Sequence, residues 1–139
     1  MPTSTKPLVI FSHGNSFPAS TYSAVFQSLK ARGFQVKAIE KFGHDPRYPV
    51  TSNWPNLVQQ LADFTAREVE KCGQPAFLVG HSLGGFLSLM CAARNPSLGG
   101  HPVKGVVLVD SPILGGWRAR ALSVAKRAQL VGAISPGAI

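Results

Sequence analysis

Acidic side chains are scarce in this sequence. Its 139 residues hold 6 Asp and Glu against 14 Lys and Arg, which gives a formal charge of +8 at neutral pH. An excess of positive charge is typical of proteins that bind nucleic acid. The basic residues are scattered, however, and no basic run is interleaved with aromatic side chains. We therefore expect no nucleic-acid partner.

Cysteines and long apolar runs are scarce as well. The two cysteines, Cys72 and Cys91, lie in segments with a helical pattern, which indicates reduced thiols and leaves the compartment open. No apolar stretch is long enough to span a bilayer, and the N-terminus lacks the basic start, apolar run and cleavage site of a signal peptide. The default expectation is a cytoplasmic protein with no membrane partner, metal or cofactor.

What the sequence does contain is a regular alternation of two patterns. Hydrophobic residues make up 45% of the chain, enough for a globular core. Short apolar runs of the kind that form buried strands alternate with segments of helical period. The expected strands are 7–14, 34–40, 75–82 and 103–111, and the expected helices are 20–33, 54–73, 83–95 and a basic tail helix after 113. Such alternation predicts an α/β fold with a mostly parallel sheet and helices on both faces.

Two of these helices carry clear end signals. In 20–33 we expect Ser20 or Thr21 to cap the start of the helix and Gly33 to end it. The apolar stripe of this helix is formed by Tyr22, Val25, Phe26 and Leu29. In 54–73 we expect Asn53 to cap the helix and Pro55 to occupy its first turn.

The segment Gly80-His81-Ser82-Leu83-Gly84 has the spacing G-x-S-x-G. The pattern alone is weak, but here a buried strand precedes it and a buried helix follows it. So sharp a turn forces the serine into a strained backbone conformation, and the flanking positions must be small so that strand and helix can approach. Ser82 is therefore the candidate nucleophile, and the N–H of Leu83 at the start of the helix is free to donate to an anion.

A second element lies at the end of the first strand. His13-Gly14-Asn15 forms a polar turn there, and the carboxyl ends of parallel strands share one edge of a sheet. The N–H groups of Asn15 and Leu83 can then form an oxyanion hole.

These motifs resemble the N-terminal half of an α/β-hydrolase-fold serine hydrolase. The resemblance covers about residues 7–112, through "VIFSHGNSF", "LVGHSLGG" and "VKGVVLVDS". It implies that residues 1–112 form part of a hydrolase core and that 113–139 begin a helical cap or a loose tail. It also implies an ester-like acyl substrate, with Ser82 as nucleophile and Asn15 and Leu83 as oxyanion donors. Gly14, Gly80, His81 and Gly84 support the motifs, and His13 anchors the oxyanion loop.

The chain departs from the family's pattern after the serine. The family order is Ser, then Asp or Glu, then His, but the acid Asp110 follows the last histidine, His101. We expect His101 at the opposite edge of the sheet, His81 to point away from the site, and His44 to lie at the right edge without touching it. Asp110 has two possible roles: it caps or hydrogen-bonds the next turn, which is the simpler interpretation, or it takes part in catalysis.

The simplest expectation is a serine hydrolase whose chain continues beyond these residues to the missing acid and histidine. The 139 residues alone should then turn over little substrate, since the oxyanion hole and binding supply only a residual rate. The alternatives are a non-catalytic ligand-binding protein on the same scaffold, an inactive fragment, or an acyltransferase or perhydrolase with the same turn. The basic tail helix could also lie on an acidic membrane surface. The oligomeric state and the identity of the acyl substrate are not readable from these residues.

Overall fold

The core of the protein is a four-stranded parallel sheet. The computed structural model describes residues 6–109, except 16 and 53. The strand order is β2 (Gln35–Ala38), β1 (Leu8–Ser12), β3 (Ala76–His81) and β6 (Gly105–Val109), and every neighbouring pair is parallel. The predicted α/β class and parallel sheet are confirmed. The predicted tail helix and the segment 113–139 lie outside the described residues.

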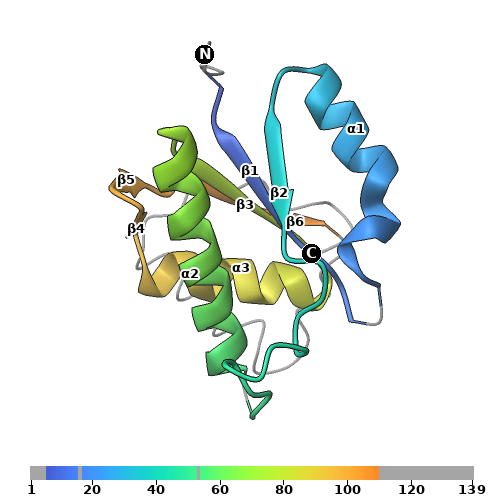
Figure 1. Cartoon of the computed structure of the whole chain (residues 1–139), viewed down its shortest axis with the longest axis vertical. Helices are drawn as coiled ribbons and strands as arrows, with labels where there is room; N and C mark the ends of the chain where they lie inside the picture. The colour runs from blue at the N-terminus through green and yellow to red at the C-terminus, as the bar shows by residue number, and fades with distance from the viewer. Residues whose placement is uncertain (1–5, 16, 53, 110–139) are drawn as a thin grey trace.

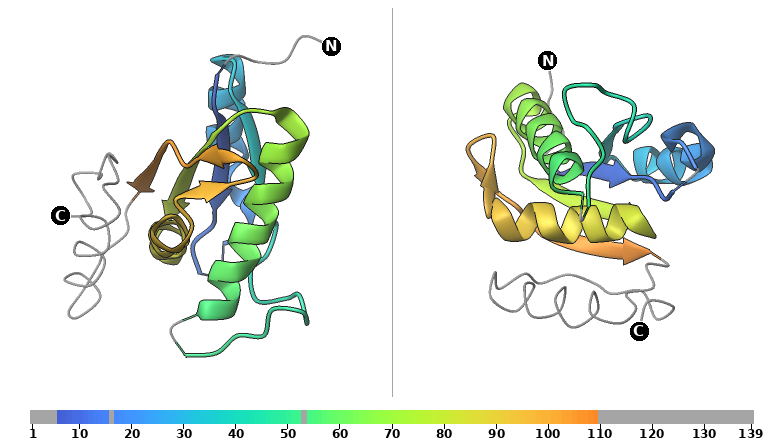
Figure 2. Two further views of the ribbon diagram at one scale, coloured as in Figure 1. Left: turned by 90° about the vertical axis from the view of Figure 1, so that its left-hand side faces the viewer. Right: turned by 90° about the horizontal axis from the view of Figure 1, so that it is seen from below.

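Helices lie on both sides of this sheet. α2 (Pro55–Cys72) and α3 (Leu83–Arg94) pack against each other and against the strands, whereas α1 (Ser23–Ala31) lies on the opposite side (Figure 1). In the view from below in Figure 2, α2 and α1 lie on opposite sides of β1. None of the described helices combines the length and the apolarity needed to cross a bilayer.

The core lies mainly between the sheet and the helix pair. β1 is buried at all five positions, as expected for a central strand covered on both faces. β3 alternates between buried and half-buried residues, so the prediction of a strand buried throughout holds for only one of its faces. The largest side chains that are almost completely buried are Leu8, Ile10, Leu61, Leu78 and Leu87.

The first helical segment is shorter than the sequence pattern predicts. A 3₁₀ turn, η1 (Ala19–Tyr22), precedes α1, and no side chain caps the start of α1. Val25 is 46% exposed, so its place in the predicted apolar stripe is wrong. The predicted stop is confirmed, because Gly33 has φ +92° and its N–H donates to the carbonyl of Lys30.

The start of α2 also differs from the prediction. Pro55 is the first helical residue, as expected, but Trp54 stands outside the helix as its N-cap, with φ 52°. Its indole packs edge-on against Phe86 of α3, with 5.8 Å between ring centroids. We attribute the unusual backbone of Trp54 to this packing, because burial of a large aromatic ring outweighs the cost of a left-handed residue. The predicted cap, Asn53, lies outside the described residues.

A small hairpin connects α3 to the last described strand and was not predicted. Its strands β4 (Ser97–Leu98) and β5 (His101–Pro102) are antiparallel and joined by two glycines, Gly99 and Gly100. Both glycines have positive φ, which two-residue hairpin turns of this kind require. His101 therefore precedes the amino end of β6, as expected.

The strand register brings two loops together at the carboxyl edge of the sheet. Ser12, the last residue of β1, pairs with Gly80 of β3. The chain segments that follow, His13 to Asn15 and His81 to Leu83, thus leave the sheet side by side. Both predicted motifs lie on these segments.

Candidate active site

Ser82 stands between β3 and α3 in a rarely populated backbone conformation. Its φ is 56° and its ψ is −121°, and Ser82 and Trp54 are the described non-glycine residues with positive φ. Such a conformation costs about 1–3 kcal/mol, so the surrounding structure must hold it in place. The strain predicted at this turn is confirmed. The role of Ser82 as a nucleophile stays a prediction.

Hydrogen bonds on both sides fix this turn. The N–H of Ser82 donates to the carbonyl of Val109 on β6, with an N···O distance of 3.2 Å. The carbonyl of Ser82 accepts from the N–H of Gly85 at 3.0 Å, which starts α3. Ser82 is a half-buried residue, so it is not fully enclosed in the core.

The glycines of the motif are required by close backbone contacts. A Cβ atom on Gly80 would overlap the carbonyl of Gly84, and a Cβ atom on Gly84 would overlap the carbonyl of Ser12. A Cβ atom on Gly14 would lie 2.8 Å from His81 Nδ1 and 3.3 Å from the Cβ atom of Ser82. The structure therefore brings the His-Gly loop into direct contact with the serine turn.

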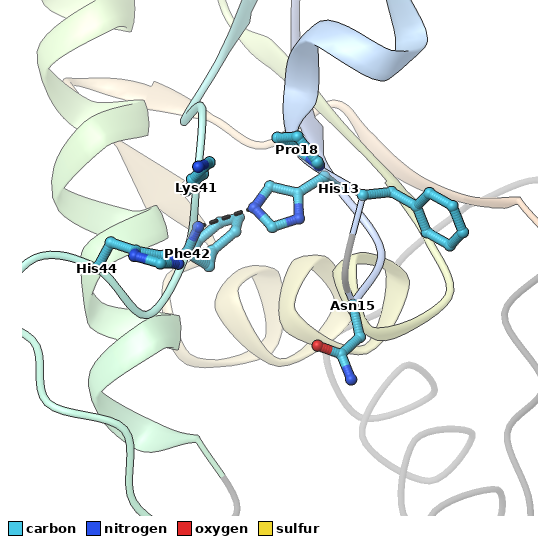
Figure 3. A pocket seen from close by; sticks show the side chains of 7 residues that line it. His13, Asn15, Pro18, Lys41, Phe42 and His44 are labelled. Carbon is cyan, nitrogen blue, oxygen red and sulfur yellow. Dashed lines mark hydrogen bonds between the residues drawn. The ribbon is translucent and has the colours of Figure 1, made fainter.

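His13 holds the loop that carries Asn15. Its Nε2 accepts a hydrogen bond from the backbone N–H of Phe42 at 2.8 Å, drawn as the dashed line in Figure 3. Since Nε2 accepts, the ring proton lies on Nδ1, which donates to the carbonyl of Gly14 at 2.8 Å. His13 is buried, and both ring nitrogens are used in these contacts. These bonds fit the predicted anchoring role, and the function of the loop as an oxyanion loop stays a prediction.

The two predicted oxyanion donors lie on these neighbouring segments. Leu83 is the first residue of α3, where the N–H groups have no acceptor inside the helix. Asn15 follows Gly14 in an exposed part of the loop. Within the part of the chain that the structure describes, no carbonyl or side chain accepts from the N–H of Leu83 or of Asn15. No described residue therefore blocks either amide from donating to a ligand.

Tyr22 is a member of this region that the sequence analysis missed. Its hydroxyl accepts from the N–H of Gly14 at 3.0 Å and lies 2.7 Å from Nδ1 of His81. The imidazole of His81 thus points toward Tyr22. The helical spacing of Tyr22 predicts only a core residue, so the sequence contains no signal for this contact.

A cavity of about 370 Å³ opens beside the His-Gly loop. It is lined by His13, Asn15, Phe17, Pro18, Lys41, Phe42 and His44 (Figure 3). His44 lines the same cavity as Asn15, because the hydrogen bond from Phe42 to His13 draws the loop after β2 toward the His-Gly loop. Ser82 and Leu83 are not among the lining residues, so the expectation that His44 does not touch the serine stays a prediction.

The loop after β2 is anchored by polar contacts of its own. Asp45 forms an ion pair with Arg47 at 2.7 Å, and the hydrogen bond from Arg47 lowers the pKa of that carboxyl. Tyr48 donates to Asp63 of α2 at 2.6 Å, and this bond raises the pKa of the Tyr48 hydroxyl. The bond from Tyr48 holds this loop against α2, away from the residues that line the cavity.

The remaining polar candidates do not join this group. His101 lies in β5 before the amino end of β6, whereas Ser82 pairs with the carboxyl end of that strand. Asp110 lies outside the described residues. Among the described residues, no side chain is hydrogen-bonded to the Oγ of Ser82. The described site thus contains the strained serine and two amides, without a base paired to the serine.

The chain is similar to several known hydrolases in sequence and in fold. A model of the alpha/beta hydrolase family matches residues 9–137. Human monoglyceride lipase is 30% identical over 118 residues, which cover 81% of this chain and 38% of that protein. The crystal structure of a pyrethroid hydrolase from Sphingobium faniae is similar with a TM-score of 0.61 and 27% identity, covering 78% of this chain and 41% of that one. A monoacylglycerol lipase from Paleococcus ferrophilus, at 24% identity and a TM-score of 0.60, shares the fold over 91% of this chain and 49% of its own.

The lengths of the relatives differ from that of this chain. The aligned chain spans 35% to 49% of the length of the haloperoxidase and lipase relatives that it matches.

Proposed function

This chain belongs to the alpha/beta hydrolase family, and on that premise we propose that it serves in ester hydrolysis, with Ser82 as the nucleophile. The amides of Asn15 and Leu83 form the oxyanion hole of this proposal. The observation that carries it is the backbone of Ser82, held at φ 56° in direct contact with the His-Gly loop. A strained serine of this kind has no packing purpose, because the residue is not fully enclosed in the core.

The proposed reaction is acyl transfer to the serine followed by hydrolysis. The Oγ of Ser82 attacks the carbonyl carbon of the ester and loses its proton to a base. The carbonyl oxygen becomes negatively charged and accepts hydrogen bonds from the N–H groups of Asn15 and Leu83. The C–O bond to the alcohol then breaks, the alcohol leaves with a proton, and water releases the acid from the serine.

The substrate class of the proposal is a neutral carboxylic ester of a fatty acid or similar acyl group. Its support is the likeness to human monoglyceride lipase and to a pyrethroid hydrolase, both named for ester substrates. The base is the part of the reaction that the described residues do not supply. Our proposal therefore requires a histidine, outside the described residues, that reaches Ser82 and acts as the base.

The test uses a fluorophosphonate, which forms a phosphonate ester with an activated serine and releases fluoride, with imidazole in solution as the base that the described site lacks. We expect covalent labelling at Ser82, located by mass spectrometry, with a rate that rises with imidazole concentration. Ser82→Ala should abolish the labelling. Ser28→Ala, which removes an exposed hydroxyl on α1, should leave it unchanged. Equal labelling of the protein and of Ser82→Ala would reject Ser82 as the nucleophile.

A non-catalytic ligand-binding protein is the second candidate. The observation that favours it is the lack, among the described residues, of a base hydrogen-bonded to Ser82. Saturable binding of a monoacylglycerol together with no labelling at any imidazole concentration would establish this alternative. Labelling confined to Ser82 would decide for the hydrolase.

A further inference from the structure

Tyr22 stands between the two segments that form the candidate active site. It is the last residue of η1 and precedes α1. Its ring packs on Phe11 of β1 with 4.6 Å between centroids and stacks beside Phe26 of α1 at 6.4 Å. These contacts hold the ring in one position, so the hydroxyl at its end is held as well.

The hydroxyl joins the two loops directly. The N–H of Gly14 donates to it at 3.0 Å, and Nδ1 of His81 lies 2.7 Å from it. The hydroxyl oxygen accepts from Gly14, and its single proton is donated to Nδ1 of His81 in the tautomer whose Nδ1 carries no proton. This arrangement uses the full donor capacity of the hydroxyl and leaves the proton of neutral His81 on Nε2.

Each of these partners immediately precedes a residue of the proposed chemistry. Gly14 precedes Asn15, the first oxyanion donor, and His81 precedes Ser82. The direct contact between the loops is a short one, since a Cβ atom on Gly14 would lie 3.3 Å from the Cβ atom of Ser82. The hydroxyl of Tyr22 therefore bonds to both of the segments that carry the proposed chemistry.

We propose that Tyr22 is a positioning residue, whose hydroxyl fixes the distance between the Asn15 amide and Ser82 by bonding to Gly14 and His81. The inference rests on the proposed function, in which these two groups act on one carbonyl. Errors of about 1 Å in such an arrangement lower rates by about a hundredfold, so a single pair of hydrogen bonds is enough to matter.

Tyr22→Phe is the central variant, because it keeps the ring packing and removes only the hydroxyl. The matched control is Tyr48→Phe, which removes the other tyrosine hydroxyl and its 2.6 Å bond to Asp63. In the fluorophosphonate assay with imidazole, we expect Tyr22→Phe to lower the labelling rate at saturating reagent about tenfold or more. The reagent concentration at half-maximal rate should change less than about twofold. Tyr48→Phe should leave both quantities within about twofold of the unaltered protein.

Nuclear magnetic resonance gives a readout that needs no reaction. In the unaltered protein, the Gly14 amide should be protected from hydrogen exchange and the Nδ1 of neutral His81 should carry no proton. In Tyr22→Phe, we expect the protection to fall at least about tenfold, the His81 tautomers to mix, and the amide signals of Asn15 and Leu83 to move. Tyr48→Phe should change none of these signals.

The outcomes separate the inference from the proposed function. If Ser82→Ala abolishes labelling but Tyr22→Phe labels at the unaltered rate, the hydrolase proposal stands and the role of Tyr22 is refuted. If Ser82 is never labelled, the proposed function fails by itself, and unmoved Asn15 and Leu83 signals in Tyr22→Phe would refute the positioning role as well. If Tyr22→Phe does not fold, hydrogen exchange in the unaltered protein still tests the inference. A Gly14 amide that exchanges as fast as the amide of a free peptide would contradict the bond to Tyr22.

Discussion

No side chain fits between Gly84 at the start of α3 and the carbonyl oxygen of Ser12 at the end of β1. A Cβ atom on Gly84 would overlap that oxygen and would lie 2.7 Å from the carbonyl oxygen of His13. The helix therefore begins in direct backbone contact with the neighbouring strand. This contact aligns the strained Ser82 with the His-Gly loop, so a local glycine determines the geometry of the site.

Gly84→Ala should destabilise the protein by about 3 kcal/mol or more, because backbone atoms on both sides must move to admit one methyl group. The effect exceeds that of a helix propensity change, which would favour alanine by about 1 kcal/mol. Urea denaturation followed by circular dichroism measures the free energy of unfolding.

The control for this variant is Gly73→Ala at the end of α2. Gly73 has φ +69°, and nothing lies within 4 Å of an added Cβ atom. We expect a loss of only about 1 kcal/mol, from the left-handed backbone alone. Similar losses at the two positions would show that the contact between Gly84 and Ser12 is not tight in solution.

The alternation of strands and helices in the main sheet and the position of the serine turn followed from local patterns in the sequence. The motif around Ser82 required a strand before it, a helix after it and glycines at 80 and 84, and the structure has all of these. The reason is that each requirement is local, set by the backbone within a few residues. The neighbouring position of His13 followed from one general rule, that parallel strands end at the same edge.

The features that could not be predicted depend on contacts between distant segments. Trp54 leaves the helix because its ring meets Phe86, which lies 32 positions later in the sequence. Tyr22 bonds to His81, 59 positions away, and a helical spacing says nothing about where its hydroxyl ends. The loop containing His44 is drawn to the cavity by a bond from Phe42 to the ring of His13. Periodicity cannot encode such partners, because it describes only which face of an element is apolar.

His13→Ala should lower the free energy of unfolding by about 2–4 kcal/mol. The substitution removes two hydrogen bonds and leaves the N–H of buried Phe42 without its acceptor, which alone costs about 1–3 kcal/mol. The lost ring also leaves a gap against Phe42, whose ring centroid lies 5.2 Å away. Thermal and urea unfolding measure the change.

His44→Ala is the comparison for this second prediction. His44 lines the same cavity but is exposed, so its removal should alter stability by less than about 0.5 kcal/mol. A stability of His13→Ala equal to that of His44→Ala would contradict the anchoring role of His13.

The two cysteines should differ sharply in reactivity. Cys91 is fully buried on α3, and burial raises the pKa of its thiol to about 12. At pH 8, roughly one such thiol in ten thousand is ionised, against about a quarter for an ordinary cysteine. Iodoacetamide at pH 8 should therefore modify the half-buried Cys72 and spare Cys91, as read by mass spectrometry of peptides.

The same shift has a consequence for stability. The folded state retains the Cys91 proton above the ordinary thiol pKa of about 8.5, where the unfolded state loses it. The contribution of Cys91 to stability is thus complete below about pH 8.5 and declines as the pH rises toward 12.

The control for the iodoacetamide experiment is the protein unfolded in urea, in which both thiols should be modified. Equal modification rates of the two thiols in the folded protein would contradict the burial of Cys91.

Ser82→Gly should make the protein more stable while removing the proposed nucleophile. Serine at φ 56° and ψ −121° stores about 1–3 kcal/mol of strain, whereas glycine adopts this conformation without cost. Part of the gain is offset because glycine loses more backbone entropy on folding, so we expect a net increase of about 1 kcal/mol in the free energy of unfolding. Ser28→Gly, placed in the ordinary helical backbone of α1, should instead lower stability by about 0.5–1 kcal/mol. A stability loss of the same size in both variants would mean that Ser82 is not strained, and the argument that its position serves chemistry rather than folding would then have no support.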